Sequence, residues 1–244
     1  MATRENQSPT RDLVEFCVGY GLILATIWTL NPWQRWFYWI AIAWIVVTTC
    51  IHRPTWRAVG LGLPGLLQSL WVVGVAVLLA GLAIYIAHRM HSLHRLHGPT
   101  PLIPHVWGYL IWSVMQQFLL QIYFLVRLMR LLPGKVAPIV AAAGLFSLAH
   151  LPNPVLTPVT LVWGIAACVL FLRYRNIYAL GIAHGILGLC VAVIVPDSIQ
   201  HHMRVGIGYY RYHPHRNQMA QMVSTDAWVM ADAPTRRSWR QASP

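Results

Sequence analysis

Long apolar runs, separated by short polar or proline-containing breaks, occupy the chain from Leu13 to Val195. A helix that crosses a bilayer needs roughly 20 apolar residues, with a tolerated range of about 17 to 25. Seven runs approach this length, and we predict a helix for each of them: Leu13–Leu30, Trp33–Ile51, Leu66–Ala87, His105–Leu125, Val136–Leu151, Val155–Leu172 and Ile177–Val195.

The fifth run is the shortest, and Leu151-Pro-Asn-Pro154 ends it, so we expect it to stop inside the protein. The predicted fold is an all-α polytopic transmembrane bundle of seven helices, or eight if one more element crosses, with an intramembrane polar cavity. Residues 1–12 form a predicted polar N-terminal segment and residues 13–195 the transmembrane domain. Residues 196–244 form a polar tail that is expected to be partly disordered.

The cavity is predicted from polar residues inside the apolar run between Trp107 and Arg130. Gln117 and Gln121 are four residues apart and share one helix face, with Gln116 beside them. Polar side chains inside a membrane generally face the protein interior or a wet cavity, because hydrocarbon offers them no hydrogen-bond partner. Amides that only tie helices together are the alternative interpretation.

Two histidines lie in later apolar runs at equal intervals. Gln116 and His150 are 34 residues apart, and so are His150 and His184. This interval is about one membrane helix with its turn, so neighbouring helices can bring the three positions to a similar depth. We therefore expect both imidazoles to point at Gln116 or Gln117.

Composition places the chain among integral membrane proteins, since 57% of its residues are hydrophobic, 10% are charged and the mean hydropathy is +0.53. The net charge of +12 is spread over every connection, including the run His88–His97, which we interpret as a basic linker at the membrane surface. Contact with anionic lipid is therefore favoured, and nucleic-acid binding is not expected. Lys and Arg are more frequent in the connections on the same side of the membrane as the N-terminus, which predicts a cytoplasmic N-terminus. We expect the location to be a bacterial inner (plasma) membrane.

The positions of the acidic residues restrict which reactions the predicted cavity can catalyse. Glu15 and Asp197 are the acids nearest to apolar runs, each at an edge, so no carboxylate is predicted in the hydrocarbon layer. Zinc bound by His150 and His184 alone is not expected, because two neutral ligands fall short of the usual three or four. We expect no metal and no cofactor.

Three short motifs lie in this order: Gln116-Gln117-x-x-x-Gln121, Phe146-x-x-x-His150 and His184-x-x-x-Gly188. They resemble the core of the CPBP family, also called the ABI or CAAX-protease-like family. That family carries Glu-Glu-x-x-x-Arg, Phe-x-x-x-His and His-x-x-x-Asn on successive membrane helices. The second motif matches fully, the third has Gly188 in place of asparagine, and the first has lost every charge. The resemblance covers about Arg53 to Val195.

The resemblance implies a glutamate-dependent intramembrane peptidase. Its water-activating roles would fall on Gln116 and His150, its oxyanion-stabilising roles on His184 and Gly188, and its charge pair on Gln117 and Gln121. A neutral amide cannot take a proton from water near neutral pH, so Gln116 cannot serve as a general base. Loss of the second acid together with its arginine avoids an unpaired buried charge.

Three functions remain open from sequence. The first is a peptidase-type hydrolase whose base is His150, oriented by Gln116, with His184 polarising the scissile carbonyl. The second is a non-proteolytic scaffold that binds a peptide, a lipid or a partner helix. The third is an enzyme acting on an isoprenoid or other lipid, in which aromatic rings shield a developing cation; the candidate rings are Trp107, Trp112, Tyr123 and Trp163. The expected partners are membrane lipid and a membrane-embedded peptide or lipid substrate.

Overall fold

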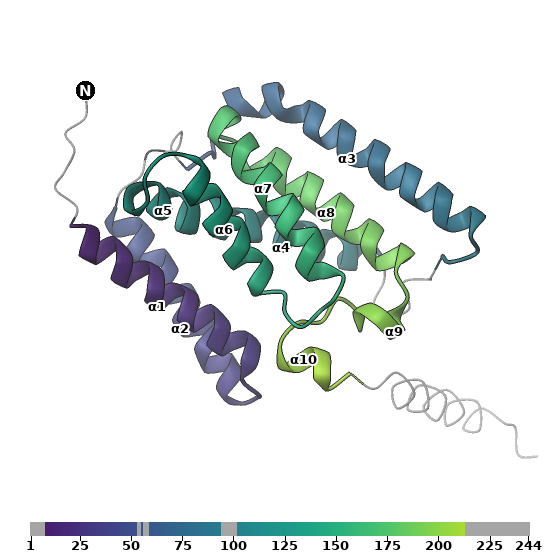
Figure 1. Cartoon of the computed structure of the whole chain (residues 1–244), viewed down its shortest axis with the longest axis horizontal. Helices are drawn as coiled ribbons and strands as arrows, with labels where there is room; N and C mark the ends of the chain where they lie inside the picture. The colour runs from purple at the N-terminus through teal and green to yellow at the C-terminus, as the bar shows by residue number, and fades with distance from the viewer. Residues whose placement is uncertain (1–7, 53–54, 56–58, 94–101, 213–244) are drawn as a thin grey trace, which may run out of the picture. The chain divides into compact units, whose positions relative to one another are not determined.

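The computed structural model describes residues 8–52, 55, 59–93 and 102–212 of the chain. This part is built from helices and contains no strand; the helices are α1 (Pro9–Trp28), α2 (Trp33–Ile51), α3 (Pro64–Arg89), α4 (Leu102–Gln117), η1 (Phe118–Leu125), α5 (Val126–Leu131), α6 (Val136–Leu148), α7 (Leu156–Tyr174), α8 (Ile177–Ile194), α9 (Asp197–Gln200) and α10 (Ile207–Tyr210). The predicted all-α polytopic bundle is confirmed (Figure 1).

Five stretches in the described part are long and apolar enough to cross a membrane: Trp33–Ile51, Gly65–Arg89, Val106–Leu131, Leu156–Tyr174 and Ile177–Ile194. Sequence predicted seven such runs, and α1 and α6 account for the difference. The α1 helix carries Asp12 and Glu15, whereas α6 has only 13 residues. The short α6 agrees with the prediction that the fifth run stops early. The later part of the predicted His88–His97 linker lies outside the described residues.

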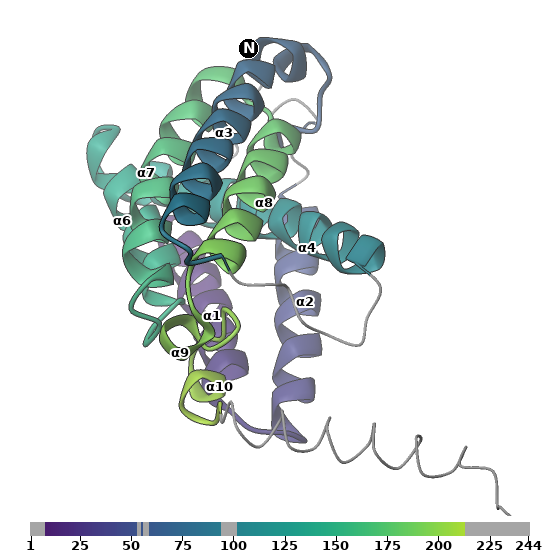
Figure 2. The ribbon, with the colours of Figure 1, turned by 90° about the vertical axis from the view of Figure 1, so that its right-hand side faces the viewer.

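The helices pack as neighbouring pairs. The α3, α7 and α8 helices run side by side in Figures 1 and 2, α6 packs on α7, and α1 packs on α2. The α4 helix crosses α8, and glycines make this crossing close. A Cβ atom on Gly181 would lie 2.5 Å from Val114 Cγ2, and one on Gly185 would lie 2.5 Å from Leu110 Cδ2. The two helices therefore approach closely, and this contact brings the first and third motifs together.

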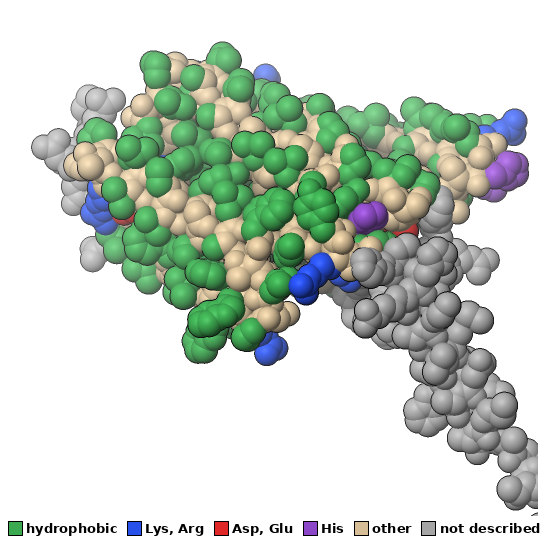
Figure 3. Space-filling view, turned by 60° about the horizontal axis from the view of Figure 1, so that its bottom comes forward, with side chains coloured by type: hydrophobic (Ala, Val, Ile, Leu, Met, Phe, Trp, Pro, Cys, Tyr) green, Lys and Arg blue, Asp and Glu red, His purple; other side chains and the backbone are tan. Residues whose placement is uncertain are grey.

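The core lies between η1, α6, α7 and α8. Leu120, Leu125, Ala142, Ala167 and Phe171 are completely buried there. Large apolar side chains also cover the outside, as on the face in Figure 3, where charged groups are few. An apolar outer surface is the arrangement that a lipid environment requires.

The helix of the first motif changes type at its centre. Gln117 ends the regular α-helical part, and the next eight residues, Phe118–Leu125, form a π-helix. At its end the Val126 N–H donates to the Gln121 carbonyl, five residues earlier. Since π-helical turns inside α-helices are frequent at functional sites, the region between Gln117 and Arg127 is a candidate functional region.

The polar segment that follows α8 returns to the bundle. Asn153, in the connection after α6, donates to the Gln200 carbonyl at 2.8 Å and to the Arg204 carbonyl at 3.1 Å. Its side-chain oxygen accepts from the N–H groups of Val155 and Leu156 at 3.1 and 2.9 Å. The first part of the predicted tail is thus held against the connection after α6, whereas residues 213–244 lie outside the described residues.

Asn153→Ala should lower the free energy of unfolding by about 2–4 kcal/mol, because four buried hydrogen bonds worth roughly 1 kcal/mol each are lost. Thermal unfolding in detergent measures this. Asn31→Ala, at an exposed asparagine before α2, is the matched control and should melt like the wild type. Equal melting temperatures for both variants would contradict the role assigned to Asn153.

Candidate functional site

His150 follows the last turn of α6 and is held by its own backbone. Its Nδ1 lies 2.7 Å from the Phe146 carbonyl oxygen, and the Phe146 and His150 rings are 4.9 Å apart in an edge-on contact. A carbonyl oxygen can only accept, so Nδ1 must carry the hydrogen. In neutral His150, Nε2 is therefore a hydrogen-bond acceptor.

His184, on α8, is held by a row of amides from the neighbouring helix. The Gln121 Nε2 group donates to Gln117 Oε1 at 3.1 Å, and Gln117 Nε2 lies 3.2 Å from His184 Nδ1. Because Gln117 uses its oxygen to accept from Gln121, it presents an N–H to His184. His184 Nδ1 is then the acceptor, and its Nε2 carries the hydrogen.

The two histidines share one cavity of about 350 Å³. Gln116, Phe146, His150, His184 and Gly188 all contribute to its wall. The ring of Phe146 lies between the imidazoles, 4.9 Å from that of His150 and 5.9 Å from that of His184. The structure thus brings residues of all three motifs to one place.

The three glutamines have different positions. Gln116 lines the cavity, whereas Gln117 and Gln121 are completely buried and are not among its lining residues. Sequence grouped Gln117 and Gln121 with the residues of the pocket itself. Their contacts show instead that they support His184 from behind.

Only two of the four aromatic residues proposed from sequence to shield a cation line the cavity. Trp112 and Trp163 line the cavity, and the Trp163 and His184 rings are 6.0 Å apart. Trp107 and Tyr123 do not line it. A cage of all four rings is therefore excluded, because Tyr123 faces a different group of residues.

Gly188 lies one turn after His184 and contacts Tyr109 of α4. A Cβ atom on Gly188 would overlap the Tyr109 hydroxyl and would lie 2.8 Å from Tyr109 Cζ. The space beside Gly188, where the resemblance expects asparagine, is therefore occupied by Tyr109. Sequence reasoning did not identify Tyr109, although a glycine at this motif position indicates a close neighbour.

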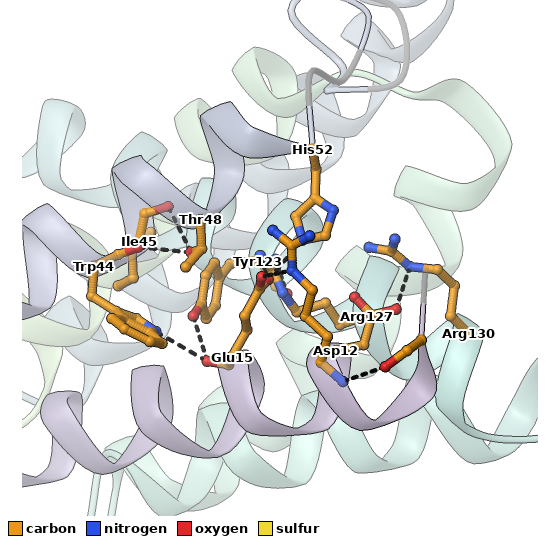
Figure 4. Close-up of polar contacts among 11 residues, drawn as sticks. Asp12, Glu15, Trp44, Ile45, Thr48, His52, Tyr123, Arg127 and Arg130 are labelled. Atoms are coloured by element: carbon orange, nitrogen blue, oxygen red, sulfur yellow. Dashed lines mark hydrogen bonds and ion pairs between the residues drawn. The ribbon is translucent and has the colours of Figure 1, made fainter. Parts of the chain in front are cut away.

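A second polar cluster joins α1, α2 and α5 and was missed from sequence (Figure 4). Glu15 was expected at the membrane edge, but only 5% of it is exposed. Its Oε2 lies 2.9 Å from an Arg127 nitrogen and 2.6 Å from His52 Nε2, and its Oε1 lies 2.9 Å from Arg11 Nε. The spacing of Arg11 and Glu15, four residues apart on one helix, was the available signal.

Arg127 lies in the last turns of its helix, yet only 2% of it is exposed. Its guanidinium donates to the Tyr123 carbonyl at 3.0 Å and lies 4.0 Å from the centre of the Tyr123 ring. The Tyr123 hydroxyl donates to the Glu15 carbonyl at 2.6 Å. Glu15 is the reason that Arg127 turns inward, because a buried guanidinium needs a buried carboxylate.

Asp12, Glu15 and His52 also place one ligand atom each within 4.8 Å of one another, a spacing that suits a metal ion. Arginines already neutralise both acids, however, since Arg130 Nε lies 3.3 Å from Asp12 Oδ2 and Arg127 pairs with Glu15. We assign the cluster to structure rather than to metal binding.

Arg127→Met should lower the free energy of unfolding by about 3–5 kcal/mol, because it leaves the buried Glu15 without its most buried partner. Glu15→Gln combined with Arg127→Met should recover part of this loss. Arg11→Met is the control: the Arg11 side chain is 46% exposed, so its pair with Glu15 should be worth about 1 kcal/mol or less. Additive losses in the double variant, measured by denaturant unfolding in detergent, would contradict the coupling.

Comparison with known proteins agrees with the motifs. Residues 98–190 match the family model described as type II CAAX prenyl endopeptidase Rce1-like. No curated protein and no solved structure matches the chain significantly. The matched residues contain all three motifs and most of the cavity wall, so this part of the chain is similar to the CAAX-protease-like, or CPBP, family, and the long apolar helices identify an integral membrane protein.

Proposed function

We propose that the protein is an intramembrane hydrolase in which His150 replaces the carboxylate as the general base. The observation that carries this proposal is that the two histidines of one cavity have different partners at Nδ1: a carbonyl oxygen for His150 and a side-chain amide for His184. The bond from His150 Nδ1 to Phe146 leaves His150 Nε2 as an acceptor. The amide row behind His184 leaves His184 Nε2 as a donor. Hydrolysis of an acyl bond needs one group of each kind.

The reaction follows from these two groups. His150 Nε2 takes a proton from water, whose oxygen attacks the substrate carbonyl carbon. The carbonyl π electrons move to oxygen, which accepts a hydrogen bond from His184 Nε2–H. When the intermediate collapses, the bond to the leaving nitrogen breaks and His150 returns the proton to that nitrogen. The products are a carboxylic acid and an amine.

The remaining polar groups hold this arrangement. Gln116 lines the same cavity and can hydrogen-bond the attacking water, but it takes no proton. Gln117 and Gln121 fix which nitrogen of His184 carries the hydrogen, and they do so without a charge. Each has a positioning role, since neither lines the cavity.

The cavity wall indicates the substrate class. Most lining residues are apolar, with contributions from α1, α2, α4, η1, α6, α7 and α8. A membrane-embedded peptide, or an acyl compound with a lipid or isoprenoid chain, fits such a wall. A bacterial inner membrane location is part of the same proposal, and the cytoplasmic N-terminus in it rests on the distribution of Lys and Arg.

A binding-only function is the second candidate. Among the described residues that line the cavity there is no Asp or Glu. A scaffold that holds a peptide or lipid without cleaving it needs no base. A lipid-modifying enzyme is the third candidate, and its support is reduced to Trp112 and Trp163.

His150→Ala should lower turnover by about 10²–10⁴-fold, the usual contribution of general acid–base catalysis. The measurement is cleavage of membrane-protein and prenylated-peptide substrates by protein in lipid vesicles. His91→Ala, at an exposed histidine that does not line the cavity, is the control and should retain wild-type turnover. Binding without any product from the wild type would favour the scaffold instead.

Gln116→Glu alone should not produce strong cleavage beyond the wild-type level. Gln121 stands where the resemblance expects an arginine, and Arg127, further along the same helix, is already paired with Glu15. Without a cation in an apolar wall, the new carboxyl group stays protonated and is a poor base. Gln116→Leu is the companion variant and should reduce cleavage, because it removes the water contact but not His150. A large gain from Gln116→Glu would return the mechanism to a carboxylate base.

A further inference from the structure

We propose that the Tyr109 hydroxyl is the second hydrogen-bond donor to the substrate carbonyl, beside His184. This inference rests on the proposed hydrolytic function and names a residue that contacts the reacting atoms. Tyr109 comes from α4, whereas His184 and Gly188 come from α8. The crossing of these two helices brings the hydroxyl to the cavity wall.

The position of the hydroxyl is defined by Gly188. His184 and Gly188 are four residues apart and therefore lie on one face of α8. Both line the cavity, as does Tyr109. Any side chain at position 188 would overlap the Tyr109 hydroxyl and crowd Cζ and Cε1, at 2.8 and 2.9 Å from the Cβ position. The glycine thus creates the space in which the hydroxyl sits, one helical turn from His184.

The Tyr109 hydroxyl differs from the hydroxyl groups of Tyr20 and Tyr123 in its hydrogen bonds. The Tyr20 hydroxyl donates to the Leu145 carbonyl at 3.0 Å, and the Tyr123 hydroxyl donates to the Glu15 carbonyl at 2.6 Å. The Tyr109 hydroxyl has no hydrogen-bond partner among the described residues. Tyr109 is half-buried and lines the cavity, so a ligand oxygen there would supply an acceptor for its hydroxyl.

Two donors from different helices would then meet one oxygen. His184 Nε2–H is fixed by the amide row behind it, and the Tyr109 hydroxyl can rotate towards the same atom. Such a pair stabilises the negative charge that develops on a carbonyl oxygen during hydrolysis. Tyr109 forms no covalent bond and transfers no proton in this role.

The first test uses a ketone probe and does not depend on turnover. A nine-carbon dialkyl ketone, ¹³C-labelled at the carbonyl, is added to the full-length protein in detergent, and its infrared carbonyl band is recorded. We expect the band of the bound ketone to move to lower frequency than in alkane. Tyr109→Phe should move it part of the way back.

The control for this experiment is Tyr38→Phe, which removes a hydroxyl from another tyrosine that lines the cavity. It should leave the band unchanged. Tyr109→Phe keeps the ring, so its melting temperature should equal that of the wild type. An identical band in the wild type and Tyr109→Phe would overturn the proposal, as would the absence of a bound ketone band in the wild type.

The second test measures cleavage with the same variants. Tyr109→Phe should lower kcat on the order of 100-fold while KM changes little, as expected when one oxyanion donor is lost. A ketone shift without cleavage of any substrate would support the Tyr109 donor and reject hydrolysis. Cleavage that Tyr109→Phe leaves intact would reject the Tyr109 donor and retain hydrolysis.

Discussion

The buried carboxylate of Glu15 is the constraint on which the rest of this bundle depends. A carboxylate removed from water must meet cations, and Glu15 meets Arg11, Arg127 and His52. Together with the Tyr123 hydroxyl bonded to the Glu15 carbonyl, these contacts tie α1 and α2 to the helix of the first motif. Breaking one contact leaves a buried charge, so the three elements hold their relative positions strongly.

The helix of the first motif carries its charged and its neutral polar side chains in different parts. Its charged end, with Arg127, is satisfied by the ion pair to Glu15. Its middle, with Gln117 and Gln121, contributes only amides to His184. A neutral row can fix the hydrogen on an imidazole without the cost of burying further ions. The cavity therefore has an imidazole of fixed orientation in a largely apolar wall, and the described residues of that wall include no Asp or Glu.

The sequence predicted the helices well, because long apolar runs leave few alternatives for a backbone in lipid. Equal spacing also predicted the contact between Gln117 and His184, and it placed His150 near them. Glu15 was missed because an acid at the edge of a run can face water or the interior, and only its distant partner decides which. Tyr109 was missed for a similar reason: Gly188 indicates a neighbour, but the helix crossing determines which residue that is.

The π-helix Phe118–Leu125 has a consequence for how this chain tolerates insertions and deletions. An i to i+5 turn accommodates one more residue than the corresponding α-helical turn, so loss of a single residue there would restore a regular helix. A single deletion elsewhere in the same helix would instead rotate everything after it by about 100° relative to the residues before it. Arg127 would then point away from Glu15 while Gln117 still faced His184. The π-helix is therefore the part of this helix that can lose one residue and keep Gln117 and Arg127 facing their partners.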